Sequence, residues 1–311
     1  MNRYSILFLL IFIIPVSLFS QKNAAQQAQD FFDRGIVHCQ NGSLWEAIDC
    51  FTQAIKLKPN FAEAYCNRGL VLSDLGDSSG AMNDYNQVIR IDPNFARVYV
   101  CRGVEYSLLG DYKRALTDYN KAIQLDPKDE KAYFGRGNLY IETGKIELAL
   151  ADYNKAISIA PDFTEAFLNR GKIYCDMGNF KSAMDDFNQA IKLDPLYFPA
   201  YHERGLINAL IEDYDLAFAD FNRAIQINPD YTVTYIVWGL ALNEIGEYKQ
   251  AIEKLNRAIA VRPDYADAFY VRGLIHFEND NSDLARADYK RTLQLDPHHA
   301  DAQHALKELS K

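Results

Sequence analysis

Two kinds of charged residue recur at fixed places in the chain and could act on a ligand. An arginine comes immediately before a glycine seven times, and six of these arginines are followed sixteen residues later by an aspartate that precedes an aromatic residue. The arginines are Arg34, Arg68, Arg102, Arg136, Arg170, Arg204 and Arg272, and the aspartates are Asp84, Asp118, Asp152, Asp186, Asp220 and Asp288. A row of arginines could bind an anionic ligand, whereas Arg–Asp pairs would hold helices together. Trp238 and Lys254 replace both partners in one copy, and this joint replacement favours the structural ion pair.

Other residues that could do chemistry are few. The sequence contains no nucleophile elbow, phosphate-binding loop, zinc-protease motif or calcium loop. His298, His299 and His304 cluster, but their spacing does not place three ligands on one helix face, so we expect no metal site. The cysteines lack C-x-x-C spacing and are expected to be small buried side chains. Cys66 and Cys101 lie at similar heights on successive helices, which leaves a disulfide as an alternative. We therefore expect neither enzymatic activity nor a cofactor.

The elements that position these residues follow a strict period. Eight of the ten prolines are spaced 34 residues apart: Pro59, Pro93, Pro127, Pro161, Pro195, Pro229, Pro263 and Pro297. Apolar residues between them recur with helical spacing. Gly110–Asp111 is typical of a helix end and turn, and Asp126–Pro127 ends the following helix. Each unit is thus predicted to be two antiparallel helices, and the repeats are 28–61, 62–95, 96–129, 130–163, 164–197, 198–231, 232–265 and 266–299.

This pattern resembles the tetratricopeptide repeat (TPR). Three positions carry the resemblance in all eight copies: an aromatic residue and a glycine in the first helix, and an alanine in the second. In the third repeat they are Tyr99, Gly103 and Ala115. The resemblance extends from Ala28 to His299 and implies an all-α, right-handed superhelical solenoid of antiparallel helix pairs. Residues 300–311 have an apolar side and a polar side, as expected of a capping helix.

The resemblance also indicates where a partner would bind. In such repeats the first helices line a concave groove, which a partner peptide or helix can occupy. Repeats four and five would contribute a polar zone that includes Lys131, Asn138, Asn169 and Lys172. Repeats seven and eight would contribute an apolar zone formed by Val233, Ile236, Val237, Leu240, Tyr270, Val271, Leu274 and Phe277. The apolar zone could equally pack against the capping helix or against a second copy of the chain.

The N-terminus predicts export. Residues 1–20 contain Arg3, an apolar run from Ile6 to Ile14, and then Pro15 with small residues, as in a cleaved signal peptide. An uncleaved membrane anchor is the alternative. Residues 21–27 form a polar lead that could extend the first helix.

We therefore predict an exported, periplasmic or secreted, scaffold that binds a protein or peptide partner. The net charge of −9 argues against a nucleic-acid partner. A self-associating homodimer, or a regulatory subunit of a larger envelope or secretion assembly, is the alternative function.

Overall fold

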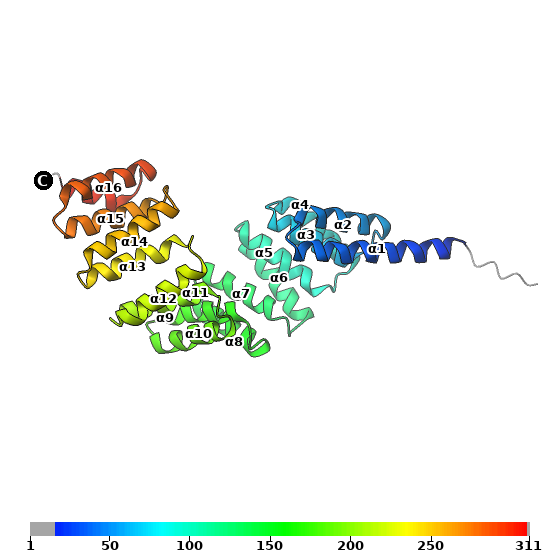
Figure 1. The fold of residues 1–311 in the computed structure, drawn as a ribbon. Coiled ribbons are helices and arrows are strands. Elements are labelled where there is room, and N and C mark those ends of the chain that lie inside the picture. The colour runs from blue at the N-terminus through cyan, green and yellow to red at the C-terminus, as the bar shows by residue number, and fades with distance from the viewer. Residues whose placement is uncertain (1–15, 310–311) are drawn as a thin grey trace, which may run out of the picture. The chain divides into compact units, whose positions relative to one another are not determined.

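The computed structural model of the protein describes residues 16–309, and every regular element in that range is an α-helix (Figure 1). The predicted all-α class is confirmed. The chain divides into two compact units between Lys155 and Ala156, inside α8 (Ile146–Ile159). The preceding helices are α1 (Val16–Gln40), α2 (Leu44–Leu57), α3 (Ala62–Asp74), α4 (Ser78–Ile91), α5 (Ala96–Leu108), α6 (Tyr112–Leu125) and α7 (Glu130–Glu142). The following helices are α9 (Thr164–Asp176), α10 (Phe180–Leu193), α11 (Phe198–Leu210), α12 (Tyr214–Ile227), α13 (Thr232–Glu244), α14 (Tyr248–Val261), α15 (Ala266–Glu278), α16 (Ser282–Leu295) and α17 (Ala300–Glu308).

The turns inside the repeats explain where the helices end. Gly110 has a φ of 74°, a left-handed conformation that glycine adopts without a steric cost. The next residue, Asp111, caps α6 by accepting a hydrogen bond of 3.0 Å from the backbone N–H of Arg114. The helix then ends directly before Asp126–Pro127, as the sequence predicts.

The two helices of a repeat pack closely because the first-helix glycine faces a second-helix aromatic ring. A Cβ on Gly103 would lie 2.9 Å from Cε1 of Tyr119, and one on Gly205 would lie 2.7 Å from Cε1 of Phe221. Both rings are buried, so glycine at this position makes room for the largest core side chains.

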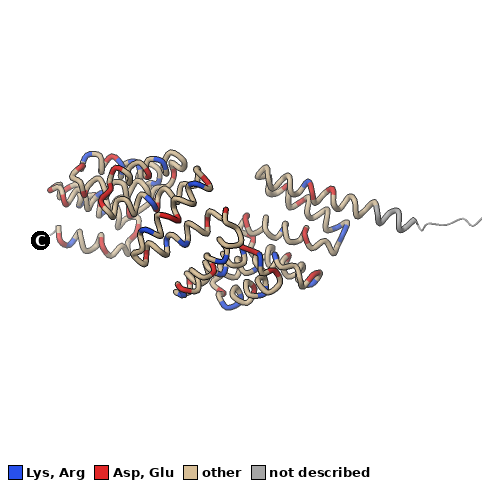
Figure 2. The backbone as a smooth tube through the Cα atoms, turned by 90° about the horizontal axis from the view of Figure 1, so that it is seen from below, with Lys and Arg blue, Asp and Glu red and all other residues tan. Residues whose placement is uncertain are grey.

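Neighbouring repeats within each unit pack the second helix of one against the first helix of the next, as α6 packs against α7, and their first helices also touch. Helix α5 contacts α3 and α7 in the first unit, and α13 contacts α11 and α15 in the second. Helix α17 packs against α16, as expected of a cap. Acidic and basic residues are interspersed along the helices rather than gathered in a stripe of one sign (Figure 2).

The predicted signal segment lies mostly outside the described residues, since the structure describes the chain from Val16. The predicted polar lead, 21–27, is helical and forms part of α1. Within residues 16–309, none of the helices combines the length and the apolar character that a membrane span requires.

Candidate functional site

The recurring arginines and aspartates form six ion pairs that join the two helices of a repeat. These pairs are Arg68–Asp84, Arg102–Asp118, Arg136–Asp152, Arg170–Asp186, Arg204–Asp220 and Arg272–Asp288, at 2.6 to 2.7 Å. In the third repeat, Nε and Nη2 of Arg102 donate to the two carboxylate oxygens of Asp118 at 2.7 and 2.8 Å. Such forked pairs are the strongest arrangement of these two groups. The predicted structural ion pair is confirmed.

The remaining guanidinium nitrogen also has a protein partner. Nη1 of Arg102 donates to Asn86 of the preceding repeat at 2.7 Å. Arg68, Arg136, Arg204 and Arg272 make the same contact to Thr52, Asn120, Asn188 and Asn256. The hydrogen bond to Asp118 raises the pKa of Arg102. Because these arginines already bind the protein, an arginine ladder for an anionic ligand has no support.

Repeat seven replaces the ion pair with a different contact. The ammonium group of Lys254 lies over the Trp238 ring at 3.7 Å from its centroid. This is a cation–π interaction, and burial lowers the pKa of Lys254. Trp238 also stacks on Phe218, with ring centroids 6.1 Å apart. The two helices of repeat seven are therefore still joined by a cation, which now comes from the second helix instead of the first. The sequence shows the two replacements but does not by itself predict this contact.

His299, Cys66 and Cys101 make structural contacts. Nδ1 of His299 accepts a hydrogen bond of 3.2 Å from the N–H of Ala302 and so caps α17. Cys66 and Cys101 are buried free thiols, and their mutual hydrogen bond, together with burial, raises the pKa of Cys66. No group of side chains suited to hold a metal ion occurs in the described part of the chain.

A cavity of about 490 Å³ opens between α11 and α13 of the second unit. Its floor is apolar and consists of Leu206, Ala209, Leu210, Val237, Leu240 and Ala241. Leu210 is 63% exposed, so this apolar surface is open to solvent. Glu212, Tyr214 and Glu244 complete the lining. We call this cavity the 6–7 groove after its repeats.

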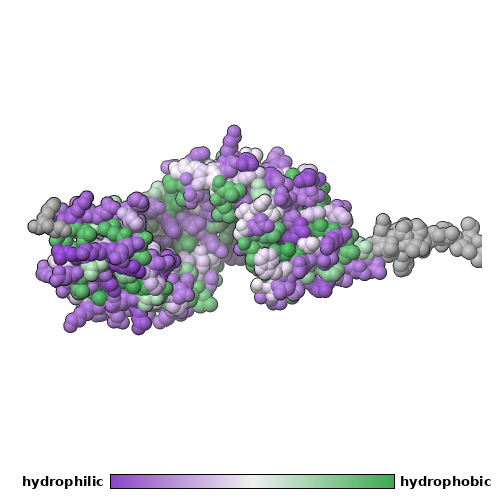
Figure 3. Space-filling view, turned by 90° about the horizontal axis from the view of Figure 1, so that it is seen from above, coloured by the Kyte–Doolittle hydropathy of each residue, from purple (hydrophilic) through white to green (hydrophobic). Residues whose placement is uncertain are grey.

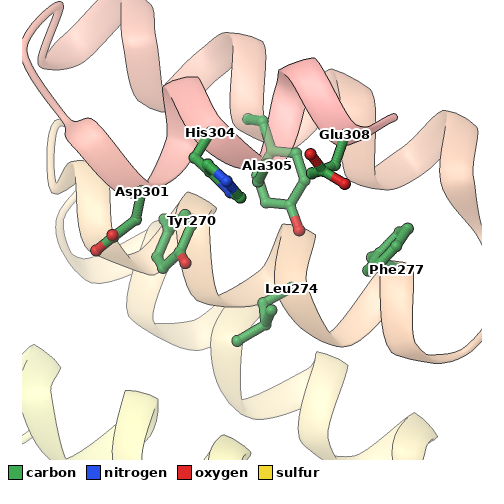
Figure 4. A pocket seen from close by; sticks show the side chains of 8 residues that line it. Tyr270, Leu274, Phe277, Asp301, His304, Ala305 and Glu308 are labelled. Atoms are coloured by element: carbon green, nitrogen blue, oxygen red, sulfur yellow. The ribbon is translucent and has the colours of Figure 1, made fainter. Parts of the chain in front are cut away.

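A smaller cavity of about 230 Å³ lies between α15 and the capping helix α17 (Figure 4). Tyr270, Leu274 and Phe277 face it from α15, and His304 and Glu308 face it from α17. The centroid of the Tyr270 ring also lies 4.7 Å from the centroid of the His299 ring. The capping helix therefore covers part of the predicted apolar zone, as one of the sequence alternatives anticipated.

The structure divides the predicted apolar zone further. Val237 and Leu240 line the 6–7 groove, whereas Val233 and Val271 are half-buried and lie outside the lining of both cavities. Ile236 is only 7% exposed and belongs to the core of the second unit. Its side chain is therefore not available to a partner. The groove also uses α11 and two residues beyond it, Glu212 and Tyr214, that the sequence did not assign to the site.

The predicted polar zone belongs to both units, and its residues are described in each unit separately. In the first unit Lys131 is exposed, and Asn138 accepts a hydrogen bond of 2.6 Å from the Tyr153 hydroxyl. In the second unit Asn169 is half-buried, and the Lys172 ammonium lies 3.4 Å from a carboxylate oxygen of Glu203.

Protein-family models match most of the chain. A model described as TPR repeat matches residues 35–76, 103–144, 137–178 and 239–280. Models described as tetratricopeptide repeat match 62–95 and 164–197, and also 198–231 and 266–299. The chain belongs to the tetratricopeptide repeat family. Among curated proteins, no match was found.

Several solved structures share the fold of this chain. A chain of the APC/C hetero-tetramer Cut9–Hcn1 aligns with a TM-score of 0.69 and 18% identity over 86% of this chain and 53% of its own length. A TPR protein from Parabacteroides merdae aligns with a TM-score of 0.62 and 21% identity, covering 80% and 99% of the two chains. PilW, a type IV pilus biogenesis factor, gives 0.62 and 22%, covering 68% and 98%. This TPR chain thus spans about half the length of the first of these relatives.

In this TPR protein the recurring Arg–Asp pairs are structural, and the 6–7 groove is the larger of the two cavities described above. The 6–7 groove has the volume and the mainly apolar lining of ligand sites in general. The cavity beside the capping helix is smaller than that range.

Proposed function

We propose that this TPR protein is an exported scaffold that binds a segment of a partner protein in the 6–7 groove. The observation that carries the proposal is the open apolar floor between α11 and α13, with Leu210 63% exposed at its edge. Burial of this floor by a partner would favour binding, because apolar surface is removed from water. TPR proteins are generally non-enzymatic scaffolds that bind proteins or peptides, which supports the same function.

The test is a pull-down with matched variants. Leu210→Asp places a charge on the floor of the groove and is expected to abolish capture of the partner from the native extract. Leu196→Asp is the control, because Leu196 is 64% exposed in the same unit but does not line the groove. Capture that survives Leu210→Asp, or that both substitutions abolish equally, would contradict the proposal.

The mass of the purified protein in solution distinguishes a monomeric scaffold from a homodimer. A scaffold with a separate partner is expected to be monomeric when pure, with a mass set by its 35.5 kDa chain less any signal segment. A dimer that Leu210→Asp converts to a monomer would favour the homodimer instead.

Export rests on the character of residues 1–20, a basic residue followed by an apolar run. Sequencing the N-terminus of the protein from its native cells should give a chain that begins at Gln21. Recovery of chains that begin at Met1 from the membrane fraction would favour the anchor.

A further inference from the structure

Near the 6–7 groove the cations of the first helices are paired with carboxylates, whereas two carboxylates lie in the groove lining. In α9, α11 and α15 the cations Arg170, Arg204 and Arg272 pair with aspartates of their own repeats. Lys172 lies beside Glu203. Helix α13 contains no lysine or arginine at all. The groove lining itself contains two carboxylates, Glu212 and Glu244, and no cation.

The two carboxylates act on the same part of the groove. The hydroxyl of Tyr214 donates to Oε2 of Glu244 at 3.1 Å. Partial burial, that hydrogen bond and the nearby charges of Glu244 and Glu212 raise the pKa of Tyr214. One tyrosine hydroxyl therefore lies within the field of both carboxylates, at the rim of an apolar floor.

Glu212 differs in residue type from the same turn position of most other repeats. Glu212 has a φ of 65°, the left-handed conformation that a glycine adopts in the turns of six other repeats. A residue with a Cβ is disfavoured there by about 1 kcal/mol relative to glycine. Here the strained residue places a carboxylate on the rim of the groove.

We propose that the 6–7 groove binds a cationic amphipathic helix, a partner class that rests on the proposed function and makes it more specific. The apolar face of the helix packs against Leu206, Leu210 and Leu240, because two neighbouring helices form a groove that accepts a third. Lysine or arginine side chains at the edge of that face pair with Glu212 and Glu244. An anionic helix of the same apolar pattern is repelled by the same two carboxylates.

The experiment uses the full chain and two synthetic helical peptides that share one apolar face of leucines. One peptide has lysines at its polar positions and the other has glutamates. The lysine peptide is expected to bind, with an affinity that falls as salt is added. The glutamate peptide is expected to bind at least about tenfold more weakly, since two ion pairs are replaced by two repulsions.

Substitutions then assign the preference to the two carboxylates. Glu212→Gly combined with Glu244→Gln should weaken binding of the lysine peptide by about fivefold and narrow the difference between the two peptides. Glu212→Gly also relieves the left-handed backbone, so the fold is retained while a charge is lost. Asp280→Gly is the matched control, because Asp280 has a φ of 60° in the turn of repeat eight but does not line the groove. It should leave both affinities unchanged.

Equal affinity for the two peptides, or an unchanged preference in the double variant, would overturn the cationic partner but not the proposed function. In that case Leu210→Asp would still abolish capture in the pull-down. If neither peptide binds, the inference is also wrong, and the pull-down decides the proposed function separately.

Discussion

Glu105 differs from its counterparts in the other repeats. The same position of the first helix holds Val71, Leu139 and Ile207, which are all buried and apolar. Glu105 is only 1% exposed, and its Oε1 accepts a hydrogen bond from the Ser73 hydroxyl. Its Oε2 has no hydrogen-bond partner among the residues that the structure describes. A buried polar atom without a partner lowers the free energy of unfolding.

Glu105→Ile should therefore stabilise the chain. The free energy of unfolding is expected to rise by about 1 to 2 kcal/mol, since the unpaired oxygen is removed and apolar contact is gained. Urea unfolding followed by circular dichroism measures the change. Glu105→Gln is the control, because it keeps a polar side chain and should gain less. A loss of stability in Glu105→Ile would show that the carboxylate has a structural role.

His202 makes the stability of the second unit depend on pH. It is buried between repeats six and seven, with Nδ1 2.9 Å from the Thr234 hydroxyl. Burial, aided by the charge of Lys172, lowers the pKa of His202 to about 4. The unfolded chain, with a pKa near 6.5, therefore binds this proton more tightly than the folded chain. The contribution of His202 to stability is complete above about pH 6.5 and is lost as the pH falls toward about 4.

The expected size of this effect is about 2 kcal/mol between pH 7 and pH 5. His202→Gln keeps a polar partner for Thr234 and removes the titration. The variant should show a shallower fall of unfolding free energy over that range, measured by urea unfolding at each pH. Identical slopes in the two proteins would mean that His202 is not the group responsible.

In the helix pair of repeat seven, Trp238 and Lys254 form one contact, so we expect their effects on stability to be coupled. Trp238 in α13 and Lys254 in α14 occupy the positions that hold arginine and aspartate in other repeats. Asn222 in the preceding repeat occupies the position of Asn188, which accepts the third hydrogen bond from Arg204. The usual pair could therefore be restored by changing both residues.

Trp238→Arg alone would place two cations together, and Lys254→Asp alone would remove the cation from the tryptophan ring. Each single variant is expected to lose about 1 to 3 kcal/mol of unfolding free energy. The double variant should recover at least about 1 kcal/mol of the sum. Thermal and urea unfolding of the four proteins give this coupling energy. Additive losses would contradict the view that the two positions form one contact.

For the whole molecule, the period predicts much of the fold because each recurring residue type has one physical role. Glycine at position 103 and tyrosine at position 119 are explained by close helix packing, and Arg102 with Asp118 by an ion pair. The pairs were predictable because an aspartate accompanies six of the seven arginines and repeat seven lacks both partners together. Repetition supplies a comparison that a single domain sequence does not.

The candidate site was less predictable, because a residue's place in the repeat does not show how deeply its side chain is buried. Ile236 was assigned to the groove by position, yet it is buried like His202, its counterpart in repeat six. The contact of His202 with Thr234 shows why: this position packs against the first helix of the following repeat. Tyr214 was missed because it comes from the second helix of a repeat. The sequence shows that Glu212 stands where most repeats have glycine. It does not show that this side chain lies on the rim of the groove.

One surface of the C-terminal part of the chain shows apolar side chains between polar ones (Figure 3). We propose that a partner binds the apolar floor of the 6–7 groove. Hydrogen–deuterium exchange of the chain, alone and with its captured partner, tests this claim most directly. We predict slower exchange in α11 and α13 on binding, at Leu206–Leu210 and Val237–Glu244, with little change in α3 and α5. Protection confined to other helices, with none in α11 and α13, would contradict the account.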